Sequence, residues 1–365
     1  MPLETWRLLD LGALDALDTQ VIYDVVAQAI TENEAENTLI ICWPKDPLVC
    51  LGYFQEAEKD IDLEYCREND LLVVRRVIGG GGVYLDDGQL FYQTIGRIDS
   101  PTTPKNIDAY YRKFLAAPVQ AYRNLGIDAE FRPVNDIQVN GKKISGNGAG
   151  DVGDARINTG NLIFDFDFES MVRVLRVPSE KFRDKIYKSL QERMTTIERE
   201  TGNMPDRTEV KLDLIRLYEE TLDIELDKGM LSTWEKKKME EIREKYVSDD
   251  WLFWRKGRKF DVSHKVKISA TAALGTANFK AEGGLIRVTA EVVEGKIEEI
   301  VVSGDFFMIP SKGIELVEWA ITGAKAEREE ILNRITEVYA DRSLQSPGVT
   351  PEDITKAVIL AVQET

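Results

Sequence analysis

Histidine is nearly absent from this chain of 365 residues, which contains only His264. A Ser-His-Asp triad would have to use that residue, and a metal site built from several histidines is impossible. In the segment DVSHKVKIS, His264 is expected at the surface or at a strand end rather than in catalysis. Chemistry is therefore expected from lysine, arginine, carboxylates and backbone amides.

Cysteines and long apolar runs are also scarce. Cys42, Cys50 and Cys66 are odd in number and widely spaced, which argues against a disulfide framework or a CxxC metal site. Cys42 and Cys50 lie in apolar runs and are expected to be small core residues. The sequence contains no run of eighteen apolar residues, so no membrane span is predicted. The N-terminal stretch MPLETWRLLDLGALDALDTQ has no basic leader before an apolar core, so we expect no signal peptide and a cytoplasmic location.

Positive charge is in deficit. Lys and Arg number 47 against 64 Asp and Glu, giving a net charge of −17. Such a surface repels nucleic acid and acidic membranes unless basic residues concentrate in one place, so neither is predicted as a partner. The content of hydrophobic residues, 43%, and of charged residues, 30%, is that of a soluble globular protein, and the length suggests two or three domains.

The spacing of apolar residues predicts a mixed α+β protein. Helices are expected over 14–30, 61–69 and 106–125, within 168–222, and over 233–246. Strands are expected over 38–43, 47–53, 71–77, 83–87, 90–96, 137–139, 142–145 and 158–168. Two hairpins are predicted among them. One places VYLDD and LFYQTIG around Gly88, and the other turns at Asn140-Gly141, a pair typical of two-residue turns.

A second, smaller α+β unit is predicted after residue 248. The helical pattern TWEKKKMEEIREKY, 233–246, is of the charged kind that joins domains. Beyond it, two β-rich runs meet at Glu294-Gly295, and helical patterns follow at 312–322, 326–340 and 351–363. We therefore expect one domain over 1–248, connector included, and another over 249–365.

The segment RRVIGGGGVYLDD, 75–87, places four glycines behind two arginines. Without Cβ atoms, residues 79–82 can adopt positive φ and approach a ligand closely, and successive N–H groups can form an anion-binding nest. Alternation along a strand allows only one of Arg75 and Arg76 to reach that ligand. A flexible turn with solvated arginines explains the segment equally well. It is not a P-loop, because GxxxxGK[ST] is absent.

The segment NDIQVNGKKISGNGAG, 135–150, combines a tight turn with two lysines. One of Lys142 and Lys143 is expected to point inward, where it can hold a phosphate or carboxylate. The glycines that follow permit another close backbone approach, and Asp136 can offer an oxygen to Mg²⁺. A plain hairpin with solvated lysines is the alternative.

Considered together, the two glycine-rich segments suit a nucleoside triphosphate whose α-phosphate is attacked by a carboxylate. Lysine and arginine would balance the charge that grows on the phosphate oxygens, while backbone amides hold the nucleotide. No side chain in such a site needs to act as a nucleophile.

Both segments resemble the signatures of the lipoate–protein ligase A family, within the biotin/lipoate protein ligase superfamily. RRVIGGGGVYLDDGQLFYQ is similar to the family's arginine-glycine signature, and NDIQVNGKKISGNGAG to its lysine motif. The likeness extends to three further segments: DPLVCLGYFQE, INTGNLIFDFDFESMVRVL and LQERMTTI. FKAEGGLIRV and IVVSGDFFMIP resemble the family's accessory domain, here fused in the same chain.

The resemblance implies a mixed-sheet catalytic domain of the biotin/lipoate ligase, class II synthetase-like type. ATP with Mg²⁺ would activate lipoate as lipoyl-AMP, which then acylates a lysine of a lipoyl domain of a 2-oxoacid dehydrogenase E2 or of a glycine-cleavage H-like protein. It implies that Lys143 contacts the lipoyl carboxylate and the α-phosphate, and that Asp136 helps to place Mg²⁺. Residues implied along the nucleotide and the acyl-adenylate are Arg76, Gly80, Gly81, Gly82, Val83, Tyr84, Gly146, Asn147 and Gly148. Residues implied near the lipoate are Tyr53, Gln55 and Gly79.

The chain departs from the family pattern at several positions. Family members usually have Ser or Thr at Ile78, Ala at Gly82 and His at Leu85, and often a His pair at Asn158-Thr159. These changes affect the expected acyl or acceptor specificity more than adenylation, because Arg76 and Lys143 remain.

Three alternatives stay open from the sequence. An octanoyltransferase would need an active-site thiol, and no cysteine follows the lysine motif; a biotin–protein ligase would need a GRGRxGR-type loop, which is absent. A non-catalytic lipoate-binding module would release no pyrophosphate. In the ligase interpretation, the second domain assists activation, so deleting residues after about 248 is expected to impair adenylation far more than transfer from preformed lipoyl-AMP.

Overall fold

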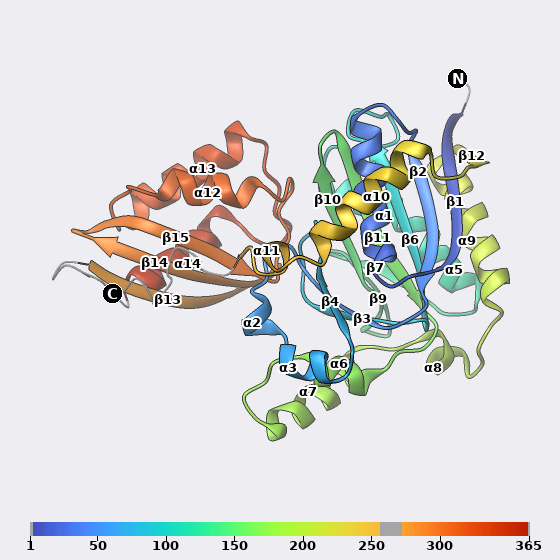
Figure 1. Ribbon diagram of the computed structural model, residues 1–365, viewed down its shortest axis with the longest axis horizontal. Helices are drawn as coiled ribbons and strands as arrows, with labels where there is room; N and C mark the ends of the chain where they lie inside the picture. The colour runs from blue at the N-terminus through green and yellow to red at the C-terminus, as the bar shows by residue number, and fades with distance from the viewer. Residues whose placement is uncertain (1–2, 256–271, 364–365) are drawn as a thin grey trace.

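The computed structural model describes residues 3–255 and 272–363, so His264 lies outside the described residues. A six-stranded sheet forms the centre of the larger part of the molecule (Figure 1). In spatial order its strands are β10 (Asn147–Val152), β11 (Ala155–Ile163), β6 (Gln89–Arg97), β2 (Thr38–Pro44), β1 (Glu4–Leu14) and β12 (Ile224–Lys228). Pairing is antiparallel from β10 to β2 and parallel from β2 to β12, so the sheet is mixed.

Helices cover both faces of this sheet. On one face, α1 (Asp18–Thr31) lies between the strands and α10 (Thr233–Tyr246), which explains why α1 buries side chains all around its axis. On the other face lie α4 (Ile107–Phe114), α5 (Ala116–Asn124) and α9 (Arg207–Leu222), and they share one apolar core with the sheet. The predicted helix over 106–125 is thus two helices, because Pro118 has no N–H to donate to the carbonyl of Phe114.

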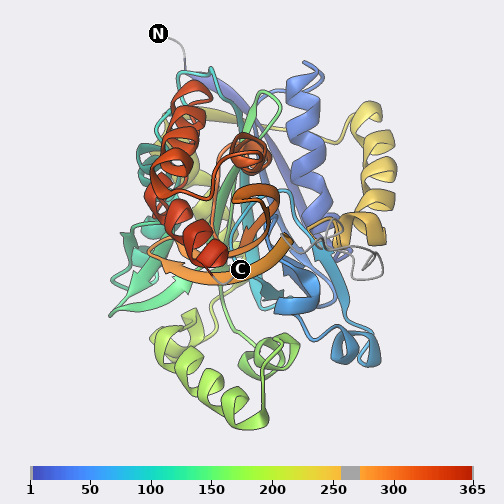
Figure 2. The same cartoon turned by 90° about the vertical axis from the view of Figure 1, so that its left-hand side faces the viewer.

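Two small sheets lie beside the central one. The first contains β4 (Leu72–Arg75), β3 (Leu48–Leu51) and β5 (Val83–Leu85), and α2 (Ala57–Asp60), α3 (Leu63–Glu68) and α6 (Phe168–Val174) belong to the same region. The second contains β7 (Glu130–Arg132), β8 (Asp136–Val139) and β9 (Lys142–Ser145). Then come α7 (Glu180–Arg193) and α8 (Ile197–Thr201); α7 buries none of its residues and projects at the lower edge in Figure 2.

The C-terminal unit, residues 272–363, has its own sheet and core. Its sheet is an antiparallel meander of β13 (Ala272–Ala281), β14 (Gly284–Val293) and β15 (Lys296–Gly304). The helices are α12 (Gly313–Ile321), α13 (Arg328–Asp341) and α14 (Pro351–Gln363). Alternate residues of β14 are buried, as expected of a sheet with one face on helices. Between the two parts lies α11 (Asp249–Leu252) (Figure 1).

Of the two predicted hairpins before residue 150, one is confirmed and one is wrong. β8 and β9 pair around Asn140 and Gly141, both with positive φ, as the Asn-Gly pair predicts. The predicted hairpin around Gly88 does not form: β5 pairs with β3 in a small sheet, whereas β6 lies between β11 and β2 in the large one. The predicted turn at Glu294-Gly295 does form.

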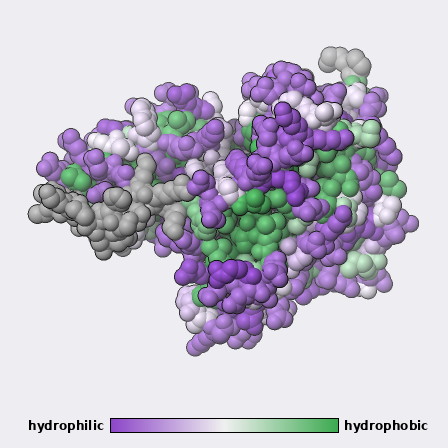
Figure 3. Space-filling model, viewed as in Figure 1, coloured by the Kyte–Doolittle hydropathy of each residue, from purple (hydrophilic) through white to green (hydrophobic). Residues whose placement is uncertain are grey.

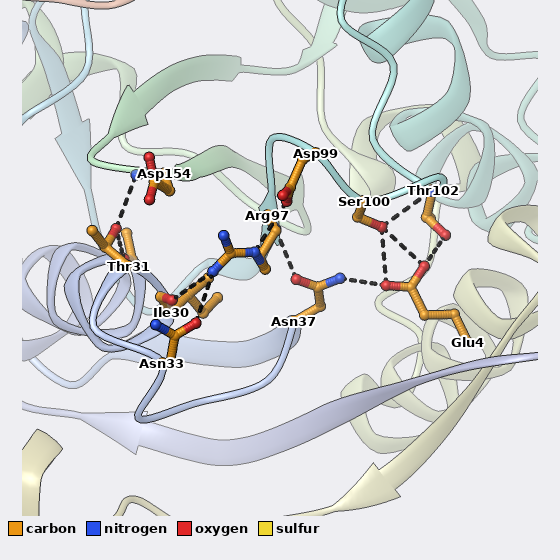
Figure 4. Close-up of polar contacts among 11 residues, drawn as sticks. Glu4, Ile30, Thr31, Asn33, Asn37, Arg97, Asp99, Ser100, Thr102 and Asp154 are labelled. Carbon is orange, nitrogen blue, oxygen red and sulfur yellow. Dashed lines mark hydrogen bonds and ion pairs between the residues drawn. The ribbon is translucent and has the colours of Figure 1, made fainter.

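Hydrogen bonds between polar side chains connect the strands at the end of the large sheet where β1 and β2 begin and β6 ends (Figure 4). Asn37 donates to Glu4 and accepts from the N–H of Arg97, and Ser100 and Thr102 donate to the same Glu4 carboxylate. These contacts hold together the end of the sheet opposite Gln89, where β6 begins.

The face seen in Figure 3 is mostly hydrophilic, with a hydrophobic area near its centre. Among the helices that the structure describes, none has both the length and the apolar composition needed to cross a membrane.

Candidate functional site

A cavity of about 490 Å³ lies where the glycine loop (residues 79–82), the β8–β9 hairpin, the large sheet and the C-terminal unit meet. Small-molecule sites commonly measure about 300–1,000 Å³. Most of the predicted site residues line this cavity: Arg76, Gly80, Gly81, Gly82, Val83, Tyr84, Asp136, Lys143, Gly146, Asn147 and Gly148. Two segments that are far apart in the sequence, 76–84 and 136–148, are thus brought to one site.

Arg76 holds the glycine loop in place. Its guanidinium donates to the carbonyl oxygens of Gly79 (2.7 Å), Gly81 (2.8 Å) and Cys50 (3.2 Å). Gly80 has a φ of +90°, and its N–H donates to the carbonyl of Phe306 at 2.8 Å. The loop therefore needs glycine at position 80 and is not a flexible turn with solvated arginines.

Arg75 points the other way and does not line the cavity. Its guanidinium is fully buried and donates to the carbonyls of Gly52, Tyr53 and Gln55, and to those of Trp251 and Leu252. Burial lowers its pKa to about 9, so the group stays protonated at neutral pH. Arg75 thereby ties the segment before the C-terminal unit to the loop that follows β3.

Lys143 lies on the inward face of the β8–β9 hairpin. Its Nζ is 2.7 Å from Oδ1 of Asp136, and the two side chains are 34% and 30% exposed. Its carbonyl accepts from the N–H of Thr195, which joins the hairpin to the end of α7. Lys143 therefore presents a cation to the cavity while its strand is held on both sides.

Polar side chains of the large sheet bind the backbone of Gly146 and the side chain of Asn147. Oδ1 of Asn161 accepts from the N–H of Gly146 at 2.9 Å, and its Nδ2 donates to Gln89 at 2.6 Å. Tyr92 donates to Oδ1 of Asn147 at 2.5 Å. Sequence analysis missed Asn161 and Gln89, although a polar residue inside the apolar strand NLIF was a usable signal.

The other wall of the cavity is apolar. Cys50, Ile78, Leu85 and Phe91 line it and belong to one core cluster. Two of the departures from the family pattern, Ile78 and Leu85, thus lie in this wall. Thr159 lines the cavity as well, whereas Asn158 points to the opposite face of β11, where its buried amide has no hydrogen-bond partner.

The cysteines are free and buried, as predicted for Cys42 and Cys50. Cys50 is also a cavity residue. Burial raises the pKa of its thiol, an effect that Arg76 offsets only in part. The reactive thiolate form is therefore disfavoured at Cys50.

The C-terminal unit completes the cavity. The lining residues come from the end of β13 and the turn after it, and from the segment that follows β15; they are Lys280, Glu282, Asp305 and Phe307. The contact is tight, because a Cβ on Gly79 would lie 2.5 Å from the carbonyl oxygen of Phe306, and Phe54 stacks on Phe306 with centroids 4.7 Å apart. None of these residues of the C-terminal unit is a site residue predicted from the sequence.

Three predicted site residues lie outside the cavity lining. Tyr53 packs against Phe54, Trp251 and Trp254. Oε1 of Gln55 accepts from the N–H of Gly52 at 3.0 Å, and Gly79 contacts the C-terminal unit. All three support the loops around the cavity, and their role toward lipoate stays a prediction.

Known proteins match both parts of the chain. The lipoyl protein ligase A/B catalytic domain matches residues 15–218, more than half of the chain, and the bacterial lipoate protein ligase C-terminus matches residues 276–358. The lipoate-protein ligase LplJ of Bacillus subtilis is 27% identical over 316 residues, 86% of this chain and 89% of that protein. The octanoyltransferase LipM of Moorella thermoacetica is 28% identical over 271 residues, 69% of this chain and 99% of that protein.

Solved structures agree. A bipartite lipoate protein ligase of Thermoplasma acidophilum, studied with its E2 lipoyl domain, has a TM-score of 0.59 at 30% identity, over 68% of this chain and 96% of that one. A lipoate-protein ligase A bound with ATP has a TM-score of 0.58 at 27% identity, over 68% and 98%. LipL1 of P. falciparum in complex with lipoate has a TM-score of 0.66 at 16% identity, over 94% and 98%, which shows the fold alone.

These matches confirm the predicted fold, a catalytic domain of the biotin/lipoate ligase type followed by an accessory C-terminal domain. With the family model over residues 15–218 and relatives that include a lipoate ligase and an octanoyltransferase, the chain belongs to the lipoyl protein ligase A/B family.

Proposed function

We propose that this protein is an ATP-dependent lipoate–protein ligase with a catalytic domain over 1–248 and an accessory domain over 249–365. The observation that carries the proposal is the position of Lys143, whose ammonium lines a cavity with one apolar wall and one polar, glycine-rich wall. A molecule with an apolar acyl chain and a carboxylate next to a polyphosphate matches both walls. The ATP bound to the similar ligase A structure is in line with this.

In the first step, a carboxylate oxygen of lipoate attacks the α-phosphorus of ATP. The bond from that phosphorus to the bridging oxygen of pyrophosphate breaks, and lipoyl-AMP and pyrophosphate form. Lys143 stabilises the charge on the α-phosphate and on the lipoyl carboxylate, which lets the two anions approach. The apolar wall at Ile78, Leu85 and Phe91 holds the acyl chain, and residues 80–84 and 146–148 hold the adenylate.

In the second step, the amine of an acceptor lysine attacks the acyl carbon of lipoyl-AMP. The amide bond forms, AMP leaves, and the amine loses a proton. No side chain of the enzyme forms a covalent bond with the acyl group. We propose a lipoyl domain as acceptor, of a 2-oxoacid dehydrogenase E2 or an H-like protein; the E2 lipoyl domain of the similar Thermoplasma ligase supports this.

The residues present fit a Mg²⁺ ion that comes with the nucleotide. Within residues 3–255 and 272–363, no cluster of three or more metal-ligating side chains forms a complete site. Mg²⁺ commonly needs only one or two carboxylates besides substrate phosphates and water, and Asp136 supplies one carboxylate beside Lys143. When bound, the ion would neutralise part of the phosphate charge.

A second candidate is acyl transfer through a thiol, favoured by the similarity to octanoyltransferase LipM. Among the described cavity residues, Cys50 carries the thiol that would be needed. Its burial and its raised thiol pKa argue against it as a nucleophile.

The test is pyrophosphate release from ATP with and without lipoate, followed by mass analysis of an apo-lipoyl domain. A ligase releases pyrophosphate only with lipoate and adds one lipoyl group to the acceptor. Pyrophosphate release with octanoate or biotin, and none with lipoate, would mean that the protein is a ligase for that other acid. No release with any of the three, combined with acyl transfer from octanoyl carrier protein, would make the protein a transferase; no activity in either assay would make it a binding module.

A further inference from the structure

We infer that Lys280, from the C-terminal unit, binds the β- and γ-phosphates of the nucleotide. The inference rests on the proposed function and deepens it, since it assigns a nucleotide contact to the accessory domain. Lys280 is on β13, one residue before the end of the strand, and its side chain lines the cavity together with residues of the glycine loop and with Lys143.

The two other cations of the described cavity already have a role, because Arg76 holds the glycine loop and Lys143 is proposed to bind the α-phosphate. Among the described residues that line it, cationic side chains belong to Arg76, Lys143 and Lys280. Arg76 donates to loop carbonyls, and Lys143 is 2.7 Å from Asp136. Lys280, in contrast, is 68% exposed, and its Nζ is 4.0 Å from Oδ1 of Asp305, beyond hydrogen-bond distance. Its ammonium can turn to a ligand without breaking a hydrogen bond to Asp305.

Asp305 keeps Lys280 at the cavity mouth. Its carboxylate accepts from the N–H of Leu285, which fixes the carboxylate at the start of β14. A Cβ built on Gly81 would lie 3.7 Å from Cβ of Asp305, so Asp305 lies directly beside the glycine loop. The attraction of Asp305 across 4.0 Å therefore favours positions of the Lys280 ammonium near the same loop, and it is weak enough for the ammonium to turn to a ligand.

The arrangement of the walls indicates which part of the substrate Lys280 meets. With the acyl chain on the apolar wall and the α-phosphate at Lys143, the outer phosphates extend toward the polar mouth. ATP carries about four negative charges, and a compact ammonium on a flexible stem suits terminal phosphates. AMP, which lacks those two phosphates, would not reach Lys280.

The experiment compares the affinity of the full-length protein for ATP and for AMP, by calorimetry in the presence of Mg²⁺. Lys280→Ala is expected to weaken ATP binding about five- to tenfold, as for one exposed charge-assisted contact, and to leave AMP binding unchanged. Lys280→Arg should retain most of the ATP affinity. The matched control is Lys296→Ala, because Lys296 begins β15 beside Val293, at the far end of the same sheet.

The inference is overturned by equal ATP affinity in Lys280→Ala and wild type, or by an equal loss of affinity for ATP and AMP. An equal loss in Lys296→Ala would also overturn it, since the effect would then be one of net charge. Failure of the proposed function gives another pattern. Wild type would bind ATP in a Lys280-dependent way yet release no pyrophosphate with lipoate, and the nucleotide contact would stand. If wild type bound no ATP, both would be wrong.

Discussion

Ile78 packs directly against Gly150. A Cβ built on Gly150 would lie 2.6 Å from Cγ2 of Ile78, and one built on Gly148 would lie 3.1 Å from its Cδ1. The side chain that departs from the family's usual Ser or Thr therefore occupies space that the glycines of the lysine segment leave free. A large apolar side chain at position 78 therefore requires glycine at positions 148 and 150.

Gly150→Ala is accordingly expected to destabilise the protein by about 1–3 kcal/mol, the usual cost of overpacking a core. The cause is steric, since Gly150 is not among the residues with positive φ. Urea unfolding measures the loss. In the double mutant Gly150→Ala/Ile78→Ala, part of the lost free energy of unfolding should be recovered. If the loss in the double mutant equals the sum of the losses in the two single mutants, the two residues do not interact and the contact is contradicted.

Cys50→Ala separates the two candidate chemistries. If the protein is a ligase, the variant should keep lipoylation within about threefold of wild type, because the thiol takes no part in the chemistry. Its only cost is the loss of a small buried group and of the long hydrogen bonds to Gln20 (3.4 Å) and from Arg76 (3.8 Å). A thiol-dependent transferase would lose its activity entirely. Cys66→Ala is the matched control, since that cysteine is buried outside the cavity.

Asp24 on α1 gives a prediction on pH. Burial raises the pKa of this carboxyl, and hydrogen bonds from Gln28 and Tyr246 offset the effect only in part. An acid whose pKa is higher in the folded state costs no stability below its unfolded pKa, about 3.9, and costs progressively more as pH rises above it. Asp24→Asn removes that cost.

The free energy of unfolding of Asp24→Asn, relative to wild type, should therefore increase as pH rises above about 4, until the raised pKa of the folded state is reached. Urea titrations at several pH values measure it, with the exposed Asp46→Asn as control. A difference that does not change with pH would mean that Asp24 is ionised without penalty in the folded protein.

Removing the C-terminal unit tests its part in adenylation. The structure favours ending the shortened chain at 255 rather than near 248, because Arg75 donates to the carbonyls of Trp251 and Leu252. Without the unit, the loop loses the bond from Gly80 to Phe306, and the cavity loses one wall. We expect lipoyl-AMP synthesis to fall at least tenfold and transfer from preformed lipoyl-AMP to change much less. Equal losses in both half-reactions would contradict this role.

Local sequence patterns predicted the strands that pair with a neighbour close by in the sequence. Asn140-Gly141 predicted its hairpin because two-residue turns depend on those residues alone. VYLDD and LFYQTIG have the same alternation, yet β5 and β6 pair with strands far along the chain, and alternation carries no information about a distant partner. Likewise, the arginine pair predicted that one guanidinium reaches the cavity, as Arg76 does.

Local sequence patterns could not predict which residues of the C-terminal unit line the cavity. Lys280 lies on β13, and Asp305 directly follows β15. Both strands pair with β14, and only the docking of that sheet on the glycine loop brings the two residues to the site. Nothing in FKAEGG or SGDFF taken alone indicates a cavity 200 positions away in the sequence. Tertiary packing decides this contact.

The most direct test of the account compares lipoate-dependent pyrophosphate release by wild type, Lys143→Ala and Lys142→Ala. The two lysines are adjacent on β9, but Lys143 lines the cavity and Lys142 does not. We predict that Lys143→Ala loses at least about a hundredfold in rate, as expected when a charged group that stabilises the reacting phosphate is removed, and that Lys142→Ala stays near wild type. Equal activity of the two variants would contradict the central role of Lys143.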